Sequence, residues 1–271
     1  MLKLRLITAA LLIILTIAGI LVLPLSVFRI IAAAIILFAA WEWSILIDCK
    51  TFLHRTLYVL FIAAILWSSW YAPIIPILIA SLIWWIIAAG LIITYPKSTK
   101  LFSQGIYARA LMGVFTLVPC WLSLTFIRAA ENGIIILIFI LCIVWGADIG
   151  AYFSGKWWGK HKLAPKVSPN KTWQGLCGGI LLAIIVAVIG CIVFNISPLA
   201  WLTVIMLSIL TALFSIIGDL LESMLKRHMN IKDIGGYLPG HGGLLDRIDS
   251  LTAALPIFSL GLYMWKLFGK M

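Results

Sequence analysis

The chain has 271 residues, of which 64% are hydrophobic and only 11% are charged. A water-soluble domain of this length could not bury so much apolar surface, so the composition excludes a soluble enzyme and indicates a protein embedded in a lipid bilayer. The formal net charge is +11, but the basic residues are scattered over short polar segments. This pattern favours contact with anionic lipid headgroups or a polyanionic small substrate, and we expect no nucleic-acid partner.

Apolar runs divide the chain into about nine segments that are long enough, or nearly so, to span a bilayer. Because no segment alternates polar and apolar residues, we expect an all-α polytopic membrane protein and no outer-membrane barrel. The first run follows Lys3 and Arg5 and is too long for a signal peptide, so we expect it to be retained. The expected spans are residues 6–27, 30–47, 56–72, 74–95, 106–127, 133–153, 173–194, 199–225 and 248–268.

The basic residues predict how these spans are oriented. With a cytoplasmic N-terminus, sixteen of the 20 Lys and Arg residues fall on the cytoplasmic side and four fall outside. Such a bias is typical of the positive-inside rule. It places both long polar loops, and a polar active-site cavity between them, at the cytoplasmic surface.

The two halves of this single integral membrane domain, residues 1–271, differ in character. Residues 1–130 look like scaffold helices, with Glu42 and Asp48 as their only carboxylates. Glu42 lies inside the second expected span, where an ionisable residue indicates a functional site. The alternative, which we favour, is a Glu near the headgroups or one paired inside the bundle. Residues 131–271 carry the polar motifs, and we expect them to form the catalytic helices and loops.

A basic segment separates the sixth and seventh spans. Asp148 and Tyr152, four residues apart, share one face of the helix that precedes it. The motif Ser168-Pro169-Asn170-Lys171-Thr172 leads into the seventh helix, and either Ser168 or Asn170 would cap it. A helix N-terminus beside a lysine attracts phosphate, although such caps also occur for purely structural reasons.

The segment from Gly218 to Ser250 holds five of the nine carboxylates of the protein. In the eighth span, one helical stripe carries residues at spacings i, i+3, i+4 and i+7, namely Asp219, Glu222, Ser223 and Lys226. Asp246 and Asp249 follow at the start of the ninth span, beyond a Gly-rich turn. Carboxylates that face one another from two helix ends, with room for water and phosphate, suit Mg²⁺. The alternative is a set of ion pairs that only hold the two helices together.

These residues together resemble the signature of the phosphatidate cytidylyltransferases, also called CDP-diacylglycerol synthases. The resemblance covers residues 145–250 in detail, and one position that often holds Glu in the family is Gln174 here. The matching residues are Ser168-Pro169-Asn170-Lys171-Thr172, Gly218-Asp219-Leu220-x-Glu222 and Ser223-x-x-Lys226-Arg227-x-x-x-x-Lys232-Asp233-x-Gly235-x-x-x-Pro239-Gly240-His241-Gly242-Gly243-x-x-Asp246-Arg247-x-Asp249.

The resemblance implies a multi-pass enzyme of the inner (plasma) membrane whose active site faces the cytoplasm. Such an enzyme joins CTP to phosphatidic acid, giving CDP-diacylglycerol and pyrophosphate for phospholipid biosynthesis. It implies Mg²⁺ as a cofactor, with a monovalent cation such as K⁺ beside it. Membrane lipid surrounds the enzyme, and a homodimer is the assembly that we expect.

Roles for individual residues follow from the motif and from its chemistry. We expect Asp219 and Asp246 to bind Mg²⁺ and, with Lys226 and Arg247, to be the catalytic residues. Residues expected to bind the substrates are Ser168, Asn170, Lys171, Thr172, Ser223, Arg227, Lys232, His241, Gly242 and Gly243. Carboxylates expected to support the site as further ligands or as partners of the basic residues are Asp148, Glu222, Asp233 and Asp249.

Two other functions fit parts of this pattern. A CTP-dependent lipid-alcohol kinase would attack the γ-phosphorus of CTP and release CDP instead of pyrophosphate. A secondary transporter would also carry charges in its helices, but near the bilayer midplane. The charges of this chain gather at the cytoplasmic ends of helices, and the full motif favours the cytidylyltransferase.

Overall fold

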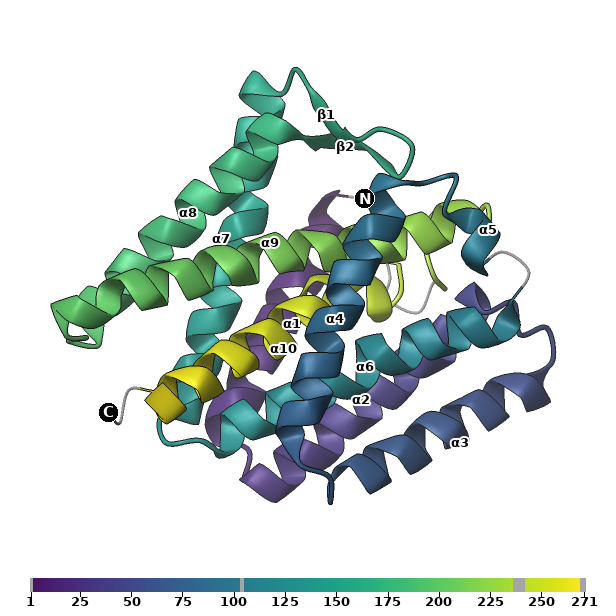
Figure 1. Ribbon diagram of the computed structural model, residues 1–271, viewed down its shortest axis with the longest axis horizontal. Helices are drawn as coiled ribbons and strands as arrows, with labels where there is room; N and C mark the ends of the chain where they lie inside the picture. Colours follow the sequence, from purple (N-terminus) through teal and green to yellow (C-terminus); the bar gives the residue numbers. More distant parts are fainter. Residues whose placement is uncertain (1, 103–104, 236–241, 269–271) are drawn as a thin grey trace.

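The structure is a computed structural model that describes residues 2–102, 105–235 and 242–268. Within these residues the chain forms nine long helices, one single-turn helix and a two-stranded sheet (Figure 1). The helices are α1 (Leu2–Val22), α2 (Leu25–Leu46), α3 (Phe52–Ser69), α4 (Ile74–Ile93), α5 (Thr99–Phe102), α6 (Ile106–Ala129), α7 (Gly133–Trp158), α8 (Trp173–Val193), α9 (Pro198–His228) and α10 (Leu245–Phe268); the strands are β1 (Lys162–Ala164) and β2 (Ser168–Thr172).

The prediction of an all-α polytopic membrane protein is confirmed, because each of the nine predicted spans coincides with one long helix. Eight helices of the described chain are long and apolar enough to cross a bilayer, and α1 contributes the shorter apolar stretch Thr8–Val22. Helices form here because lipid offers no hydrogen-bond partners, so each segment must satisfy its own backbone groups. Large apolar side chains such as Ile93 and Leu199 consequently remain exposed on the outside of the bundle.

Several helices end at a residue whose backbone is left-handed. Asn195 after α8 has φ 49° and Asn230 after α9 has φ 55°. At the first of these ends, the amide of Ile196 donates to the carbonyl of Cys191 at 2.9 Å. This bond satisfies a carbonyl that the helix leaves open, and Asn tolerates the left-handed conformation better than most residues. These asparagines therefore fix where the spans stop.

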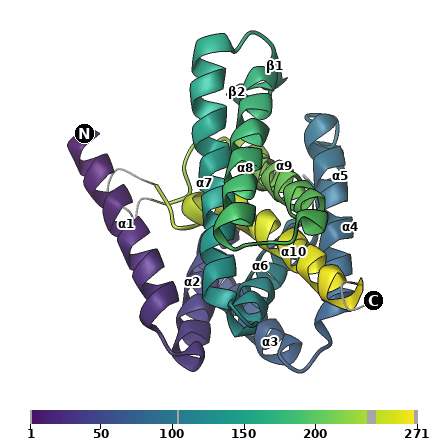
Figure 2. The same cartoon turned by 90° about the vertical axis from the view of Figure 1, so that its left-hand side faces the viewer.

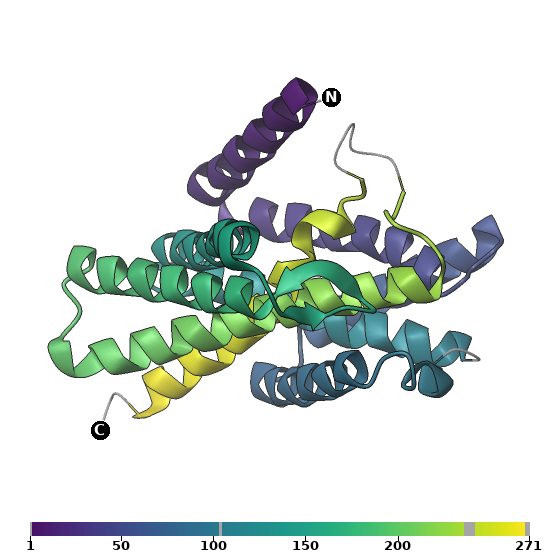
Figure 3. The ribbon, with the colours of Figure 1, turned by 90° about the horizontal axis from the view of Figure 1, so that it is seen from above.

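Helix α10 packs against helices from both halves of the chain. Helix α10 lies along α9 and also packs against α6 and α4, so it joins the predicted scaffold to the catalytic half. Figures 2 and 3 show α1 at the edge of the bundle, away from α9 and α10. Helices α7 and α8 form an antiparallel pair below the small sheet.

The α7–α8 pair packs at backbone distance. A Cβ atom at Gly150 would run into the carbonyl group of Gly178, and one at Gly178 would run into the side chain of Ser154. Only glycine permits this approach, so the two helices are held in one register. The end of α7 and the start of α8 therefore carry the hairpin between them in a fixed position.

The sheet is a feature that the sequence did not predict. Strands β1 and β2 are antiparallel, with Lys162 opposite Thr172 and Ala164 opposite Ser168. The sequence predicts only a basic loop here, because the strands are short and prolines interrupt the segment. The strand also corrects the predicted helix cap: Ser168 and Asn170 lie in β2, and the Thr172 hydroxyl accepts from the Gly175 amide at 3.0 Å to cap α8.

Candidate active site

Lys226 connects the carboxylates of the two helices that carry the motif. Its Nζ donates to Glu222 Oε1 at 3.0 Å, one turn earlier on α9, and to Asp246 Oδ1 at 2.6 Å on α10. All three side chains are largely buried, with the lysine 11% exposed. The i, i+4 spacing thus places Glu222 and Lys226 on the stripe that faces α10, as the sequence predicted.

Asp246 is bonded through both of its oxygens. While Oδ1 accepts from Lys226, Oδ2 accepts from the amides of Gly243 at 2.8 Å and Ile234 at 3.3 Å. Gly242, with φ +76°, supplies the left-handed turn that precedes these bonds. Asp246 therefore ties both ends of the 234–243 loop to the lysine on α9.

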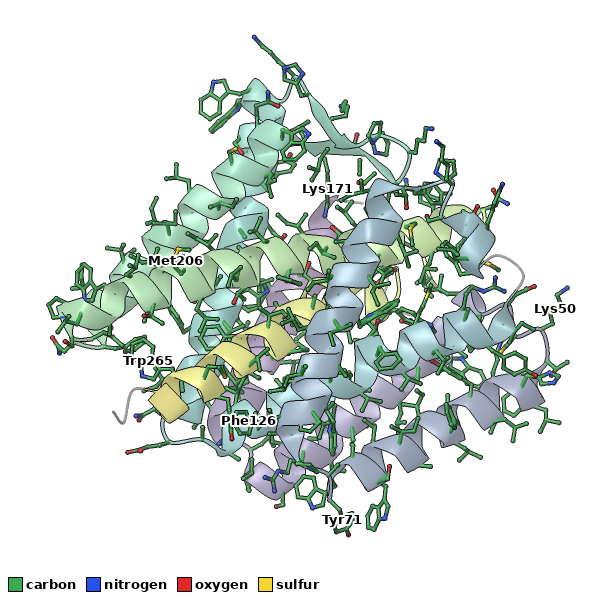
Figure 4. All side chains as sticks on the ribbon, in the orientation of Figure 1. Lys50, Tyr71, Phe126, Lys171, Met206 and Trp265 are labelled. Atoms are coloured by element: carbon green, nitrogen blue, oxygen red, sulfur yellow. The ribbon has the colours of Figure 1, made fainter. Side chains whose placement is uncertain are left out.

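Asp219 occupies a more open position near the start of the stripe. Its Oδ2 pairs with Lys171 Nζ at 2.6 Å, and Ser223 donates to its Oδ1 at 3.2 Å. The side chain of Asp219 is 32% exposed and that of Lys171 25%. Lys171, labelled in Figure 4, thus links the β2 strand to α9. The hairpin is thereby attached to the carboxylate cluster, which consists of Asp219 and Glu222 on α9 and Asp246 on α10.

Two further carboxylates join this cluster electrostatically. Asp148 on α7 lies close enough to interact with the charges of Lys171 and Asp219. Asp249 on α10 interacts with Asp219, Lys171 and Lys226. Four helices or strands, α7, β2, α9 and α10, therefore bring opposite charges to one place.

The remaining predicted residues differ in their contacts and in their exposure. Arg227 donates from Nε to the Val167 carbonyl at 3.3 Å, which ties α9 to the hairpin. Gln174, at the position where the family often has Glu, accepts from the amides of Lys160 and His161 and closes the base of the hairpin. Ser168 is half-buried, Thr172 and Gly243 are buried, and Gly242 is half-buried; the exposed residues are Asn170, Lys232, Asp233 and Arg247. His241 lies outside the described residues.

The predicted metal ligands take part in different ion pairs. Asp219 binds Lys171, whereas Asp246 binds Lys226. No group of three or more His, Cys, Asp or Glu side chains in the described parts of the chain is arranged to hold a metal ion. One buried oxygen, Glu222 Oε2, lacks a hydrogen-bond partner among those same residues. The carboxylate oxygens are of the donor type that Mg²⁺ prefers, but in this arrangement they are divided between two ion pairs.

Glu42 is the residue whose role the sequence left open. It is fully buried, and its two oxygens accept from the backbone amides of Leu244 and Leu245, at 3.0 and 2.6 Å. It is therefore paired inside the bundle, at the loop that carries the motif. A lone carboxylate in an apolar helix was the available signal, but the sequence did not identify its partners.

Comparison with known proteins places these observations in a family. A family model described as "Cytidylyltransferase family" matches residues 3–265. The chain is 40% identical over 263 residues to a protein of Pseudomonas aeruginosa named phosphatidate cytidylyltransferase, covering 96% of both chains. It is 35% identical to a protein of the same name from Haemophilus influenzae, covering 96% of this chain and 98% of the relative. A third, from Bacillus subtilis, is 38% identical and covers 65% of this chain and 66% of its own.

Proposed function

Because this chain belongs to the cytidylyltransferase family, we propose that it transfers the cytidylyl group of CTP to phosphatidic acid. The products are CDP-diacylglycerol and pyrophosphate. The observation that carries this proposal is the similarity, over nearly the whole chain, to relatives named phosphatidate cytidylyltransferase. The charge cluster of α9 and α10 supports it, since both substrates are phosphates.

The reaction needs no nucleophilic side chain. A phosphate oxygen of the lipid attacks the α-phosphorus of CTP, and the bond from that phosphorus to the bridging oxygen of the β-phosphate breaks. Pyrophosphate leaves with the electron pair of that bond. Lys171, Lys226, Arg227 and Arg247 would offset the charge of the two substrates. Among the ion pairs of the described residues, Lys171–Asp219 is the most exposed. Ser168, Asn170, Lys232 and His241 are proposed as further phosphate ligands.

We assign Mg²⁺ to the carboxylate cluster, with Asp219 and Asp246 as its protein ligands. When bound there, the ion would supply positive charge that stabilises the departing pyrophosphate. Asp246 already accepts three hydrogen bonds, while Asp219 is more exposed and accepts two. Asp219 is therefore the first residue to test. A monovalent cation such as K⁺ beside Mg²⁺ belongs to the same proposal.

The proposed enzyme lies in the inner membrane as a homodimer, with the cluster on the cytoplasmic side. The excess of basic residues in the loops that would be cytoplasmic supports this orientation. In Figure 4, Lys50 and Lys171 lie toward one side of the bundle and Phe126 and Trp265 toward the other. CTP in the cytoplasm and phosphatidic acid in the membrane would then meet at the surface that the hairpin covers.

One assay tests the reaction and its metal together. Purified protein in detergent is given phosphatidic acid and each of the four nucleoside triphosphates in turn, with Mg²⁺ or with Mg²⁺ and excess EDTA. We expect a lipid-linked nucleotide and pyrophosphate with CTP alone, and neither product with EDTA. Turnover that persists in EDTA would exclude the metal, and equal use of ATP would exclude the substrate assignment.

The same assay separates the other two functions. A lipid-alcohol kinase would release CDP and would need a lipid alcohol in place of phosphatidic acid. A transporter would release no pyrophosphate in detergent, because transport requires two compartments.

A further inference from the structure

Helix α10 begins without a capping side chain of its own. The residue before its first turn is Leu244, whose side chain has no acceptor, and the first backbone amides of any helix lack a partner within that helix. Here Glu42 of α2 supplies the missing acceptors from more than 200 residues away. Its Oε1 accepts from Leu244 at 3.0 Å and its Oε2 from Leu245 at 2.6 Å.

The contact between Glu42 and the start of α10 is buried and closely packed. Glu42 is 0% exposed and Leu245 1% exposed, so water cannot replace either partner. A Cβ atom at Gly243 would lie 2.7 and 2.8 Å from the two oxygens of Glu42. Gly243 therefore lets the carboxylate approach the turn. Hydrogen bonds from backbone amides to an ionised carboxylate are stronger than neutral ones.

The turn that Glu42 holds also positions the charge cluster. The Gly243 amide, one residue before Leu244, donates to Asp246 Oδ2 at 2.8 Å. Asp246 in turn binds Lys226 at 2.6 Å, and Lys226 binds Glu222. A shift of the 243–245 backbone therefore moves Asp246 relative to α9.

We propose that Glu42 is a positioning residue of the enzyme, which caps α10 from α2 and thereby sets Asp246 and Lys226 for the reaction. The inference rests on the proposed function, because it assigns a catalytic purpose to the cluster. It also places one residue that supports the active site on α2, in the half of the chain that was predicted to be only scaffold.

The test compares Glu42→Gln with a matched control, Ser44→Ala. Gln keeps the length of the side chain but offers only one acceptor oxygen. The amides of Leu244 and Leu245 each need an acceptor. Ser44 is equally buried on α2, and its hydroxyl bonds within that helix, to the Trp41 carbonyl. Turnover is measured against phosphatidic acid and CTP concentration, and hydrogen exchange is measured over residues 242–250.

For Glu42→Gln we expect kcat to fall about 10- to 100-fold, since small displacements of catalytic groups have effects of this order. We expect the KM for phosphatidic acid to stay within about twofold, because a displaced charge cluster impairs the reacting geometry more than lipid binding. Exchange should accelerate at Leu244 and Leu245, and Ser44→Ala should change none of these quantities.

Two results would overturn the proposal: a kcat of Glu42→Gln within twofold of the wild type, or a loss of kcat with Leu244 and Leu245 as protected as before. If Glu42→Gln does not fold, Glu42→Asp, which keeps both oxygens one methylene short, undergoes the same two measurements, and the same two results would overturn the proposal. Wild-type protein that forms no CDP-diacylglycerol would refute the proposed function instead. In that case the exchange data alone decide whether Glu42 holds the turn.

Discussion

Asp219 and Asp246 are the same residue type in unlike surroundings. Asp246 is held by a lysine and two backbone amides, so its geometry is fixed by the fold. Asp219 is one-third exposed and pairs with a lysine that is itself partly exposed. Partly exposed ion pairs are weak and exchange partners readily. Asp219 is thus the carboxylate better placed to bind an ion that arrives with the substrate.

Replacing Asp219 with Asn tests this difference. The substitution preserves size but removes the charge, and we expect the cytidylyl-transfer rate to fall about 10²- to 10³-fold, as for the loss of other groups that stabilise charge in the transition state. The control is Asp48→Asn, in the exposed loop after α2, where the left-handed backbone (φ 69°) suits Asn. A near-normal rate for Asp219→Asn at ordinary Mg²⁺ concentrations would exclude Asp219 as a ligand.

The sequence predicted some residues of the site better than others. Spacing along one helix placed Glu222 and Lys226 on a common stripe, because a helix repeats every 3.6 residues regardless of its surroundings. The partners of Glu42 could not be predicted in this way. They lie on another helix, and their identity depends on how α2 and α10 pack. The prediction of Ser168 or Asn170 as the cap of α8 was wrong because the strand before Thr172 is not apparent from the sequence.

At the scale of elements, the contact between α7 and α8 decides where the hairpin sits. The two helices touch at Gly150 and Gly178, so their separation is set by backbone atoms. The hairpin connects the end of α7 to the start of α8 and carries Lys171 to Asp219. The position of that lysine therefore depends on glycines outside the hairpin itself.

Alanine at Gly178 should be costly, whereas alanine at Gly90 should not. A Cβ atom at Gly178 would overlap Ser154, and overpacking of this kind destabilises by about 1–3 kcal/mol. Gly90 on α4 has open space around it, so Gly90→Ala should be neutral or gain up to about 1 kcal/mol from helix propensity. The thermal midpoints of the two variants in detergent measure the difference. Equal midpoints would contradict a backbone-tight α7–α8 contact.

The helices were the most predictable elements, because a long apolar run in lipid has few alternatives to a helix. The β1–β2 hairpin was not predicted, since β2 contains Pro169 and neither strand shows a clear alternation of polar and apolar residues. Its stability comes from contacts with α7, α8 and α9, which the sequence does not display.

At the scale of the whole molecule, α9 is long enough for its charged end to lie outside the hydrocarbon core of a bilayer. Its 31 residues extend about 46 Å at 1.5 Å per residue, while the hydrocarbon core of a bilayer is about 30 Å thick. The stripe from Asp219 to Lys226 occupies the last third of this helix. A helix of this length therefore lets one end reach the headgroups with its charged residues.

The proposed orientation predicts which loops a membrane-impermeant reagent can reach. In a background with the five cysteines replaced by alanine, a maleimide should label Lys162→Cys, in the hairpin, only from the cytoplasmic side. Glu131→Cys, in the loop between α6 and α7, should react only from the opposite side. Both positions are exposed, so accessibility differs only by side. Labelling of both variants from the same side would refute the topology.

The contact between Glu42 and the start of α10 also has a meaning for synthesis of the chain. Its acceptor is made about 200 residues before its donors. At 5–20 residues per second the ribosome needs roughly 10–40 s to cover that interval. During this time the Glu42 carboxylate on α2 lacks these two hydrogen-bond donors, because Leu244 and Leu245 have not yet been synthesised. The N-terminal helices are thus complete as membrane spans well before they are complete as a packed unit, and it is the late arrival of α10 that finishes them.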